Sequence, residues 1–348
     1  PMPDALHDLQ QAVDLMSAAE HPIIVAGGGV RASGAADVLI ELAERLAVPV
    51  ATSLNGKDVI PSDHPLSVGV VGTYSRASAN RTVAAADVVF FVGTETGGMT
   101  THFWQVPQLG TSVIQLDIEP EALGRNYPPQ VALYGDARAV LSEMVVLAPE
   151  TPTHRAEWLA RIADEVATWR DEWTPLLTSD AVPMRPERVV GDLSGHTPDD
   201  AIVVVDTGHA GMWMGGMYDM SAGQSYMRSA GHLGWAFPAA LGAKCAAPER
   251  PVVCFTGDSG FWYHVAEIET AVRWGINSVT VVNNNSGGNQ SKRGFDRAYG
   301  GVQTEKGAKD LWRFTDVDFA AVAKKIGAKG IRVEKPADFV PALERGLE

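Results

Sequence analysis

The chain has 348 residues, of which 45% are hydrophobic and 20% are charged, and its formal net charge is −14 at pH 7. This length and composition are typical of a globular protein of about two domains, and the negative charge argues against a general nucleic-acid or membrane-surface binder. No apolar run approaches the roughly 20 residues that span a bilayer. The opening residues, "PMPDALHDLQQ", do not show the basic and apolar regions of a signal peptide.

The two cysteines, Cys245 and Cys254, do not have the spacing of metal ligands. Both stand in apolar stretches of the sequence. We therefore expect both to be reduced core residues of a cytoplasmic protein.

The first half alternates helical patterns with short β-branched runs. A helix is expected to end within residues 13–20, and "HPIIVAGGGV" predicts a buried strand followed by a glycine-rich turn. "SGAADVLIELAERLAVPV" predicts a helix that runs into a strand at Val48–Thr52, and further strands are expected at Asp87–Gly93 and Ser112–Ile118. This alternation indicates βαβ units and a parallel sheet.

A long amphipathic helix is expected over His154–Trp173, followed by a segment rich in proline and polar residues. We place the domain boundary between about Leu147 and Pro186, so that residues 1–150 form one domain, 151–186 a helix and linker, and 187–348 a second domain. There the pattern restarts, with strands in "AIVVVDTGH", "PVVCFTGDS" and "SVTVVNNN" and helices in "GWAFPAALGAKCAAP" and "FWYHVAEIETAVRWG". The predicted fold is α/β, with two doubly wound parallel-sheet domains.

Two polar residues follow neighbouring strands of the second domain. Asp258 comes after the apolar run Pro251–Thr256, and Asn285 comes 27 residues later, after Ser278–Val282. A right-handed crossover makes these strands parallel, so their carboxyl ends share one edge. Open α/β sheets bind ligands at that edge.

The connection between the two strands is predicted to be a helix from about Phe261 to Trp274, with Gly275 as its end signal. Gly257 and Gly260 are expected to frame a tight turn before it.

The chemistry at this edge is rich in oxygen. One carboxylate, one amide oxygen and a nearby backbone carbonyl form half of the octahedron that Mg²⁺ prefers, with water and phosphate supplying the rest. The backbone N–H groups of Ser259 and Gly260 stand at a helix start, where a phosphate is favoured. The pair therefore predicts a magnesium–diphosphate site. The alternative is that Asp258 only caps a helix and that the asparagines only form turns.

"GDS" and "NNNSGG" at this spacing resemble the thiamine-diphosphate motif of the acetolactate synthase-like enzymes, and "SAGHLGWAFPAALGAKCAAPERPVVCFTGDSGF" is similar to the family's run into that motif. The resemblance assigns the Asp258 side chain, the Asn285 side chain and the Gly287 carbonyl to Mg²⁺. It implies that Leu233 props the bent cofactor, and that the loop "DTGHAGMW" places His209 and Ala210 near the diphosphate. Without the resemblance, Leu233 would be a core leucine and His209 a surface histidine.

The glycine-rich turn of the first half suits a phosphate or a dinucleotide, but it does not fit the full dinucleotide fingerprint. Residues 21–72 and "VIQLDIEPEALGRNYP" resemble the central domain of the same family, which holds FAD, ADP or nothing. The positions that match its nucleotide contacts are Gly27, Gly28, Gly29, Asp117 and Ile118. The segment "GTETGGMTTHFW" lacks the arginine of FAD-binding members, so we expect neither FAD nor ADP there.

Members of this family are about half as long again and begin with a pyrimidine-binding domain, whose glutamate activates the cofactor. No residue here matches that glutamate, so the resemblance implies no catalytic residue within this chain. We expect either a fragment of a longer chain that also lacks a closing strand and tail, or a subunit whose partner chain supplies the domain. Because the family's cofactor lies between two subunits, a homo-oligomer, either dimer or tetramer, is implied.

The resemblance implies a thiamine-diphosphate-dependent transferase or lyase that cleaves or forms a C–C bond of a 2-oxo acid. Acetolactate synthase-like carboligation is our first expectation. A 2-oxo acid decarboxylase is the alternative, as is a 2-hydroxyacyl-CoA or oxalyl-CoA lyase, which "GDSGF" and the Glu269-Thr270 pair resemble. Trp262, Tyr263 and Gln290 are candidates to face the substrate, by position only. A non-catalytic nucleotide-binding module, suggested by the glycine turn and by the missing domain, is the alternative of another class.

Overall fold

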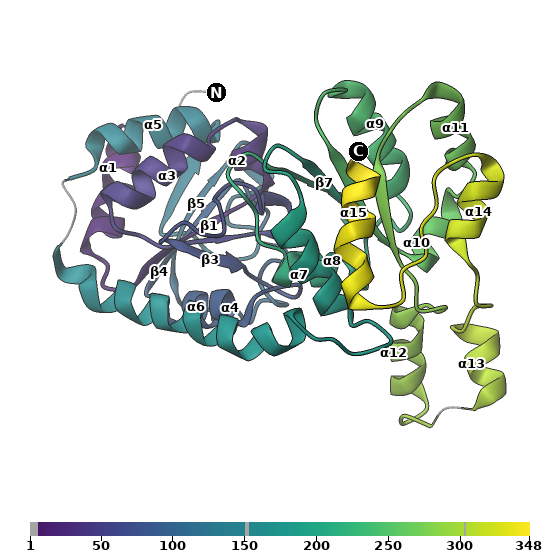
Figure 1. Cartoon of the computed structure of the whole chain (residues 1–348). Helices are drawn as coiled ribbons and strands as arrows, with labels where there is room; N and C mark the ends of the chain where they lie inside the picture. The colour runs from purple at the N-terminus through teal and green to yellow at the C-terminus, as the bar shows by residue number, and fades with distance from the viewer. Residues whose placement is uncertain (1–5, 150–152, 303) are drawn as a thin grey trace. The chain divides into compact units, whose positions relative to one another are not determined.

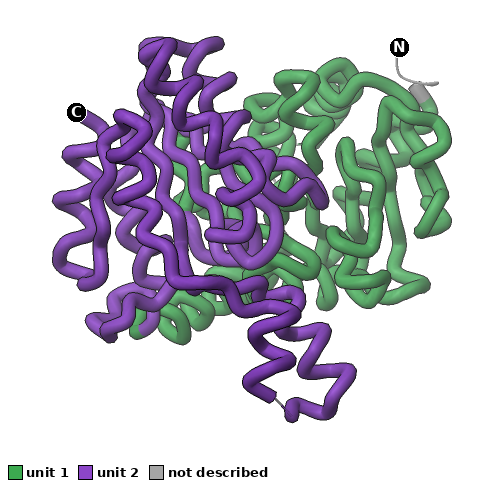
Figure 2. The backbone as a smooth tube through the Cα atoms, turned by 90° about the vertical axis from the view of Figure 1, so that its right-hand side faces the viewer, with its two compact units in different colours: residues 1–175, 219–222 green, residues 176–218, 223–348 purple. Residues whose placement is uncertain are grey.

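The computed structural model describes residues 6–149, 153–302 and 304–348, and these form two compact units (Figures 1 and 2). Unit 1 runs to Pro175 and also includes Asp219–Ala222, whereas unit 2 comprises Leu176–Tyr218 and Gly223–Glu348. The boundary falls near the end of one helix, α6 (Ala156–Leu177). Most of this helix therefore belongs to unit 1, although the sequence pattern places it between the domains.

Unit 1 contains a six-stranded parallel sheet in the order β3-β2-β1-β4-β5-β6. Its strands are β1 (Pro22–Ala26), β2 (Val50–Thr52), β3 (Ser67–Val70), β4 (Val88–Val92), β5 (Ser112–Asp117) and β6 (Val131–Tyr134). The sequence analysis missed β3 and β6, the two edge strands. Their sequences, SVGV and VALY, are too short and too mixed to stand out as apolar runs.

Helices cover both faces of this sheet (Figure 1). Alternate strand residues such as Ile24 and Phe90 pack with one helical layer, and Ile23 and Val89 pack with the other. The first layer comprises α1 (Leu6–Ala18), α2 (Gly28–Ala32), α3 (Ala36–Arg45) and α5 (Ala137–Leu147), and the second comprises α4 (Ala77–Ala85) and α6. Because a strand buried on both faces must be apolar throughout, the central strands appear in the sequence as continuous apolar runs.

Unit 2 contains a four-stranded parallel sheet in the order β10-β9-β7-β8. Its strands are β7 (Ile202–Val205), β8 (Ser225–Arg228), β9 (Val252–Gly257) and β10 (Val279–Asn283). Its helices are α7 (Pro186–His196), α8 (His209–Met217), α9 (Ala236–Ala246), α10 (Asp258–Tyr263), α11 (Glu267–Trp274), α12 (Asn289–Ala298), α13 (Glu305–Leu311), α14 (Phe319–Ile326) and α15 (Phe339–Leu347). The two parallel sheets with their helices confirm the predicted α/β class.

The core of unit 2 lies between its sheet and the helices α9, α10, α11 and α14. Val204 and Cys254 of the sheet pack there with Phe237, Phe261 and other apolar side chains. On the other side, α8 contacts β7 and β9, and α7 packs against α8 and α15. The central strands β7 and β9 are consequently buried; β7 leads into a polar loop, and β9 leads directly into α10, whose first residue is Asp258.

The connection from β9 to β10 differs from the predicted single helix. The helix begins at Asp258, three residues early, and is interrupted between Tyr263 and Glu267, which separates α10 from α11. Gly275 ends α11 as predicted. Its φ of 62° is left-handed, and the N–H groups that follow the helix bond back to its last carbonyls.

One of the two cysteine predictions was wrong. Cys254 is buried in β9, but Cys245 is exposed near the end of α9. An apolar sequence on a surface helix does not show which residues face outward, and Cys245 lies on the outward face. Among the described residues, no helix is both long and apolar enough to cross a membrane.

Candidate functional site

The ends of β9 and β10 lie side by side. The two strands pair in parallel, and Gly257 at the end of β9 stands opposite Asn283 at the end of β10. The predicted meeting of the two strand ends at one edge is therefore confirmed. Asp258 follows one strand directly, and the loop that carries Asn285 and Gly287 follows the other.

The Asp258 carboxylate joins the start of α10 to the loop after β10. One oxygen, Oδ2, accepts a hydrogen bond from the N–H of Gly287 at 2.9 Å, and Oδ1 accepts from the N–H of Ser259 at 2.7 Å. Gly257 is the N-cap residue of α10, and Asp258 is the first residue inside the helix. Asp258 thus does more than cap a helix, because its carboxylate bonds across to the loop after β10. The second part of the alternative, that the asparagines form turns, fits Asn284, whose Oδ1 accepts a turn hydrogen bond from the N–H of Ser286.

The Asp258 side chain is buried although it stands at the sheet edge, with 3% of its surface exposed. Burial raises the pKa of Asp258, and the N–H donors of Gly287 and Ser259 act in the opposite direction. A divalent cation next to this carboxylate would favour its ionised form. A bound cation would therefore offset the electrostatic cost of ionising this buried carboxylate.

The donor atoms around Asp258 fit Mg²⁺ by their chemistry. The Asn285 side chain is exposed, and its NH₂ group donates to Asn289 Oδ1 at 2.7 Å, which leaves the amide oxygen as the end available to a metal. Ser286 has a left-handed φ of 52° and turns the chain toward the buried Gly287. A carboxylate, an amide oxygen and a backbone carbonyl are the hard oxygen ligands that Mg²⁺ takes in proteins.

The loop after β7 reaches the same edge, because Val205 pairs with Phe255 in the neighbouring strand. Gly208, with φ of 86°, precedes α8, and His209 and the buried Ala210 are its first residues. Burial lowers the pKa of His209, and the nearby charge of Arg293 lowers it further. The lowered pKa favours the neutral imidazole, which can both donate and accept a hydrogen bond.

Leu233 lies in the loop between β8 and α9 and is 36% exposed, so it is not an ordinary core leucine. Gly234, next to it, has a φ of 89°. A side chain at Gly234 would come within 2.7 Å of Tyr263 Cβ, so glycine is required there for both conformation and space. The backbone thereby presents Leu233 to solvent on the loop that meets α10.

The three candidates for substrate contact differ in their surroundings. Trp262 is 40% exposed, and its ring packs edge-on against Phe319 at a centroid distance of 4.9 Å. Tyr263 is 67% exposed, and Gln290 is exposed in the first turn of α12. Trp262 thus has a packing role whatever else it contacts, whereas the assignment of all three to the substrate stays a prediction.

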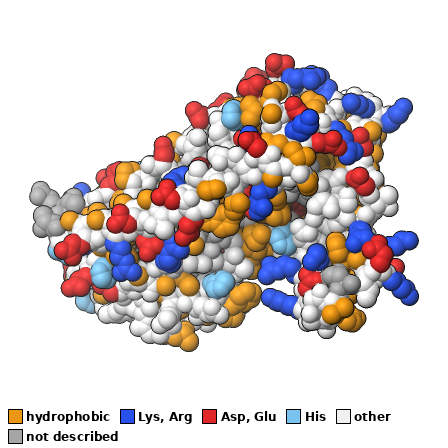
Figure 3. Space-filling view, turned by 60° about the horizontal axis from the view of Figure 1, so that its bottom comes forward, with side chains coloured by type: hydrophobic (Ala, Val, Ile, Leu, Met, Phe, Trp, Pro, Cys, Tyr) orange, Lys and Arg blue, Asp and Glu red, His pale blue; other side chains and the backbone are white. Residues whose placement is uncertain are grey.

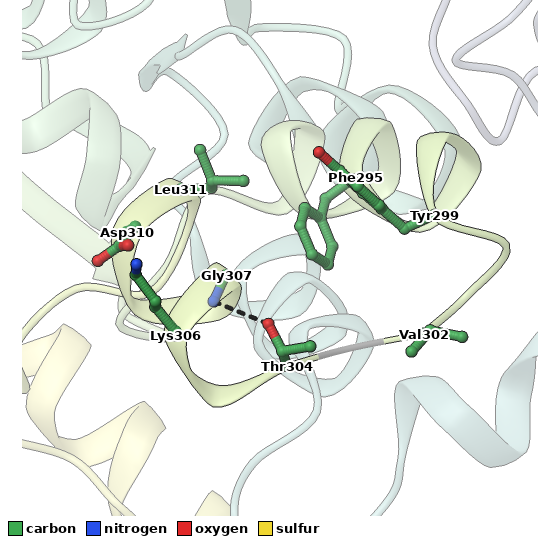
Figure 4. Close-up of a pocket in the computed structure, with 8 residues that line it drawn as sticks. All are labelled: Phe295, Tyr299, Val302, Thr304, Lys306, Gly307, Asp310 and Leu311. Atoms are coloured by element: carbon green, nitrogen blue, oxygen red, sulfur yellow. Dashed lines mark hydrogen bonds between the residues drawn. The ribbon is translucent and has the colours of Figure 1, made fainter.

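Helices α12 and α13 follow the Asn285 loop and carry exposed cations, seen gathered on one lobe in Figure 3. These are Arg293 and Arg297 on α12 and Lys306 and Lys309 on α13, and Arg313 follows two residues after α13. A cavity of about 420 Å³ lies between the two helices, and its lining side chains are drawn in Figure 4. Phe295 lies on α12 and Tyr299 directly follows that helix, whereas Lys306 and Leu311 lie on α13.

The glycine-rich turn of unit 1 has a packing explanation. A side chain at Gly27 would lie 2.1 Å from the carbonyl oxygen of Gly93, and one at Gly29 would lie 2.7 Å from Gly93 Cα. At Gly28 the nearest atom is Asn55 Cβ, at 3.3 Å. Glycine is therefore needed at Gly27 and Gly29 to let the turn approach the end of β4, with or without a nucleotide.

The other two candidate nucleotide contacts lie after β5. Asp117 is buried, which raises its pKa, and its Oδ1 accepts a hydrogen bond from the N–H of Glu119 at 3.0 Å. Ile118 is 47% exposed. Both lie at the carboxyl edge of the unit 1 sheet, and their contact with a nucleotide stays a prediction.

The sequence analysis did not single out Asp206, which is 1% exposed at the end of β7. Its carboxylate accepts hydrogen bonds from three separate segments of unit 2. The signal was present, because Asp206 is the first polar residue after an apolar strand, as Asp258 nearly is after β9.

Two models of one protein family match most of the chain. The model "Thiamine pyrophosphate enzyme, central domain" matches residues 9–144, and "Thiamine pyrophosphate enzyme, C-terminal TPP binding domain" matches residues 206–348. The first match lies in unit 1 and the second begins at Asp206 and covers the site just described.

Individual relatives agree with this match. A probable acetolactate synthase large subunit of Methanococcus aeolicus is 29% identical over 97% of the chain and 58% of the relative. The glyoxylate carboligase of Escherichia coli O157:H7 is 33% identical over 97% of the chain and 58% of the relative. The sulfoacetaldehyde acetyltransferase of Alcaligenes xylosoxydans xylosoxydans is 32% identical over 98% of the chain and 60% of the relative. The chain thus spans less than two thirds of the length of these relatives.

Proposed function

The chain belongs to the thiamine pyrophosphate (thiamine diphosphate) enzyme family, and on that premise we propose that it binds Mg²⁺ and thiamine diphosphate for a carboligase that acts on a 2-oxo acid. The observation that carries the proposal is the hydrogen bond of 2.9 Å between Asp258 and the N–H of Gly287. It joins two of the three residues proposed as metal ligands, which follow two paired strands.

In this proposal Asp258, Asn285 and the carbonyl of Gly287 hold the metal. Asp258 supplies the one negative charge, and the other two supply neutral oxygens. The diphosphate is held by this metal and by the N-terminal turn of α8, where His209 and Ala210 lie and where backbone N–H groups favour an anion. The neutral state of His209 lets it donate or accept a hydrogen bond there.

Gly260 is proposed as a further backbone contact to the diphosphate. Ser259 is less available than the sequence suggested, because its N–H already donates to Asp258. The residue supports the site indirectly in that case, by helping to fix the carboxylate.

When it is bound, thiamine diphosphate supplies a nucleophilic carbon that adds to a carbonyl group. The residues of this chain hold and orient it. Leu233, exposed on its loop, packs against the ring system and excludes water from it. Trp262, Tyr263 and Gln290 are proposed to shape the substrate's surroundings.

Bond formation is favoured over simple decarboxylation by the relatives, whose names describe a synthase, a carboligase and an acetyltransferase. The non-catalytic nucleotide-binding alternative has lost its main support. It rested on the glycine turn and on the missing domain, and close packing against Gly93 explains why Gly27 and Gly29 are glycines.

Calorimetric titration with thiamine diphosphate, with and without Mg²⁺, tests the binding. We expect binding that needs the metal and that disappears in Asp258→Ala. Binding that is independent of both the metal and Asp258 would show that the site is elsewhere. Carboligation itself is tested with the complete gene product, pyruvate and a second carbonyl compound. Release of carbon dioxide without a joined product would make the protein a decarboxylase instead.

A further inference from the structure

Asp206 is a buried carboxylate to which the proposed function assigns no ligand. It stands at the end of β7, the strand next to β9, and is 1% exposed. Its Oδ1 accepts hydrogen bonds from the N–H groups of Thr207 at 2.7 Å and Gly234 at 3.0 Å. Its Oδ2 accepts from the hydroxyl of Thr256 at 2.9 Å. Both oxygens are therefore engaged inside unit 2.

These donors come from the three segments that carry the proposed cofactor contacts. Thr207 begins the loop to His209, Gly234 directly follows Leu233, and Thr256 stands two residues before Asp258. α10 packs onto the same carboxylate, because a side chain at Gly260 would lie 2.6 Å from Asp206 Oδ2. The Asp206 carboxylate thus contacts three segments: the one before His209, the loop that carries Leu233, and the end of β9 before Asp258.

Such a carboxylate is costly to keep inside a protein. Burial raises the pKa of Asp206, and the hydrogen bonds from Thr207, Thr256 and Gly234 act against that rise. A buried charged network of this kind is weak support for stability, because apolar residues often pack as well in its place. Its hydrogen bonds nevertheless fix the relative positions of the groups that donate them. The buried Asp206 carboxylate is therefore better explained by its effect on the positions of these segments than by a contribution to stability.

We propose that Asp206 is a positioning residue that sets the Leu233 loop against the junction of β9 and α10, where Asp258 lies. The thiazolium end and the diphosphate end of one cofactor would then be held at a fixed separation by a single buried group. This inference rests on the proposed function, since it assumes that both segments contact the same cofactor.

Thr256 offers the cleanest test, because it is fully buried and its side chain can be changed without a change of size. Thr256→Val removes the hydroxyl and leaves the shape, whereas Thr256→Ser keeps the hydroxyl. Thr82→Val in unit 1 is the matched control, since Thr82 is also buried and its hydroxyl donates one bond of 2.8 Å, to the carbonyl of Ser78. Asp206→Asn is the second variant of the network.

The affinity for thiamine diphosphate at saturating Mg²⁺ is measured by calorimetry, and turnover is measured with the complete protein at saturating cofactor. We expect Thr256→Val and Asp206→Asn to bind the cofactor about 10- to 100-fold more weakly, as is typical when a group that orients a metal site is lost. Turnover should stay reduced at saturating cofactor, and Thr256→Ser should restore both. Thr82→Val should match the wild type in both measurements.

A residue that served stability alone would behave differently. Thr256→Val would then lower the melting temperature as Thr82→Val does, and full turnover would return once the cofactor saturates, which would overturn the proposal. If Asp206→Asn does not fold, the Thr256 pair decides the matter. If the wild type binds no thiamine diphosphate, the proposed function fails. If the wild type binds, Asp258→Ala does not, and both network variants bind normally, only the positioning role fails.

Discussion

Asp258→Asn should separate the stability of the free protein from its ability to bind cofactor. The wild-type carboxylate is buried, and burial raises its pKa above that of an ordinary aspartate. A raised pKa means that the folded chain favours the protonated carboxyl. Its contribution to the free energy of unfolding is therefore present below about pH 3.8 and is lost as the pH rises through the folded-state pKa.

An amide at this position has no charge to bury, so the variant lacks that pH dependence. At pH 7 the metal-free variant should be about as stable as the wild type. The amide oxygen can accept from only one of the two donors, the N–H of Gly287 or that of Ser259. The variant also loses the single negative charge of the proposed metal site.

The binding effect should be much larger. A lost charge-assisted interaction of about 1.5–3 kcal/mol corresponds to an affinity that is weaker by roughly 10- to 150-fold. At a cofactor concentration of about 100 times the wild-type Kd, the ligand stabilises the protein by about 2.7 kcal/mol, and a 100-fold loss of affinity reduces this to about 0.4 kcal/mol. For a unit of this size, the melting temperature should then rise on binding by roughly 5–11 °C in the wild type and by about 1 °C in the variant.

The assay is differential scanning calorimetry of the chain with Mg²⁺, with and without thiamine diphosphate. Asp199→Asn is the control, because Asp199 is an exposed acid of the same unit and its change removes the same charge. The reasoning is refuted if Asp258→Asn keeps the wild-type shift, or if Asp199→Asn loses it equally.

Four further outcomes are expected. Asn285→Ala removes one neutral ligand and should weaken metal-dependent cofactor binding by about 2- to 10-fold in calorimetry; a loss larger than that of Asp258→Asn would reverse the two roles. Leu233→Ala should weaken the binding of thiamine diphosphate but not that of inorganic diphosphate, and an equal effect on both would refute the proposed contact between Leu233 and the cofactor's ring system. Gly275→Ala forces an alanine to a φ of 62° and should lower the free energy of unfolding by about 1–2 kcal/mol; an unchanged urea midpoint contradicts this. The purified protein should show no flavin absorbance, because "GTETGGMTTHFW" has no arginine, and a stoichiometric flavin peak would disprove it.

The sequence was sufficient for the class of fold and for the centre of the site. Central parallel strands are buried on both faces, so β1, β4, β7 and β9 appear as continuous apolar runs. The parallel crossover then places Asp258 and the Asn285 loop at one edge, and the register of Gly257 with Asn283 agrees. These conclusions need only periodicity and chain direction, which are local properties.

Three of the four edge strands, and the outward faces of the helices, could not be predicted from the sequence. β3, β6 and β8 have four residues each and lie at sheet edges. Each pairs with only one neighbouring strand, so its sequence need not be a continuous apolar run. The interruption between α10 and α11 and the exposure of Cys245 were likewise missed. In each case the outcome depends on what packs against the segment, which no local pattern records.

The tertiary structure alone decided how the site is held together. Gly27 and Gly29 look like phosphate-binding glycines in the sequence, but their small size is required by the approach of Gly93, more than 60 residues away. Asp206 looks like any polar residue after a strand, yet its carboxylate bonds to residues as far along the chain as Thr256. A sequence shows that a carboxylate is present at a strand end. Only the folded chain determines which donors reach its two oxygens, because they come from segments that meet only in three dimensions.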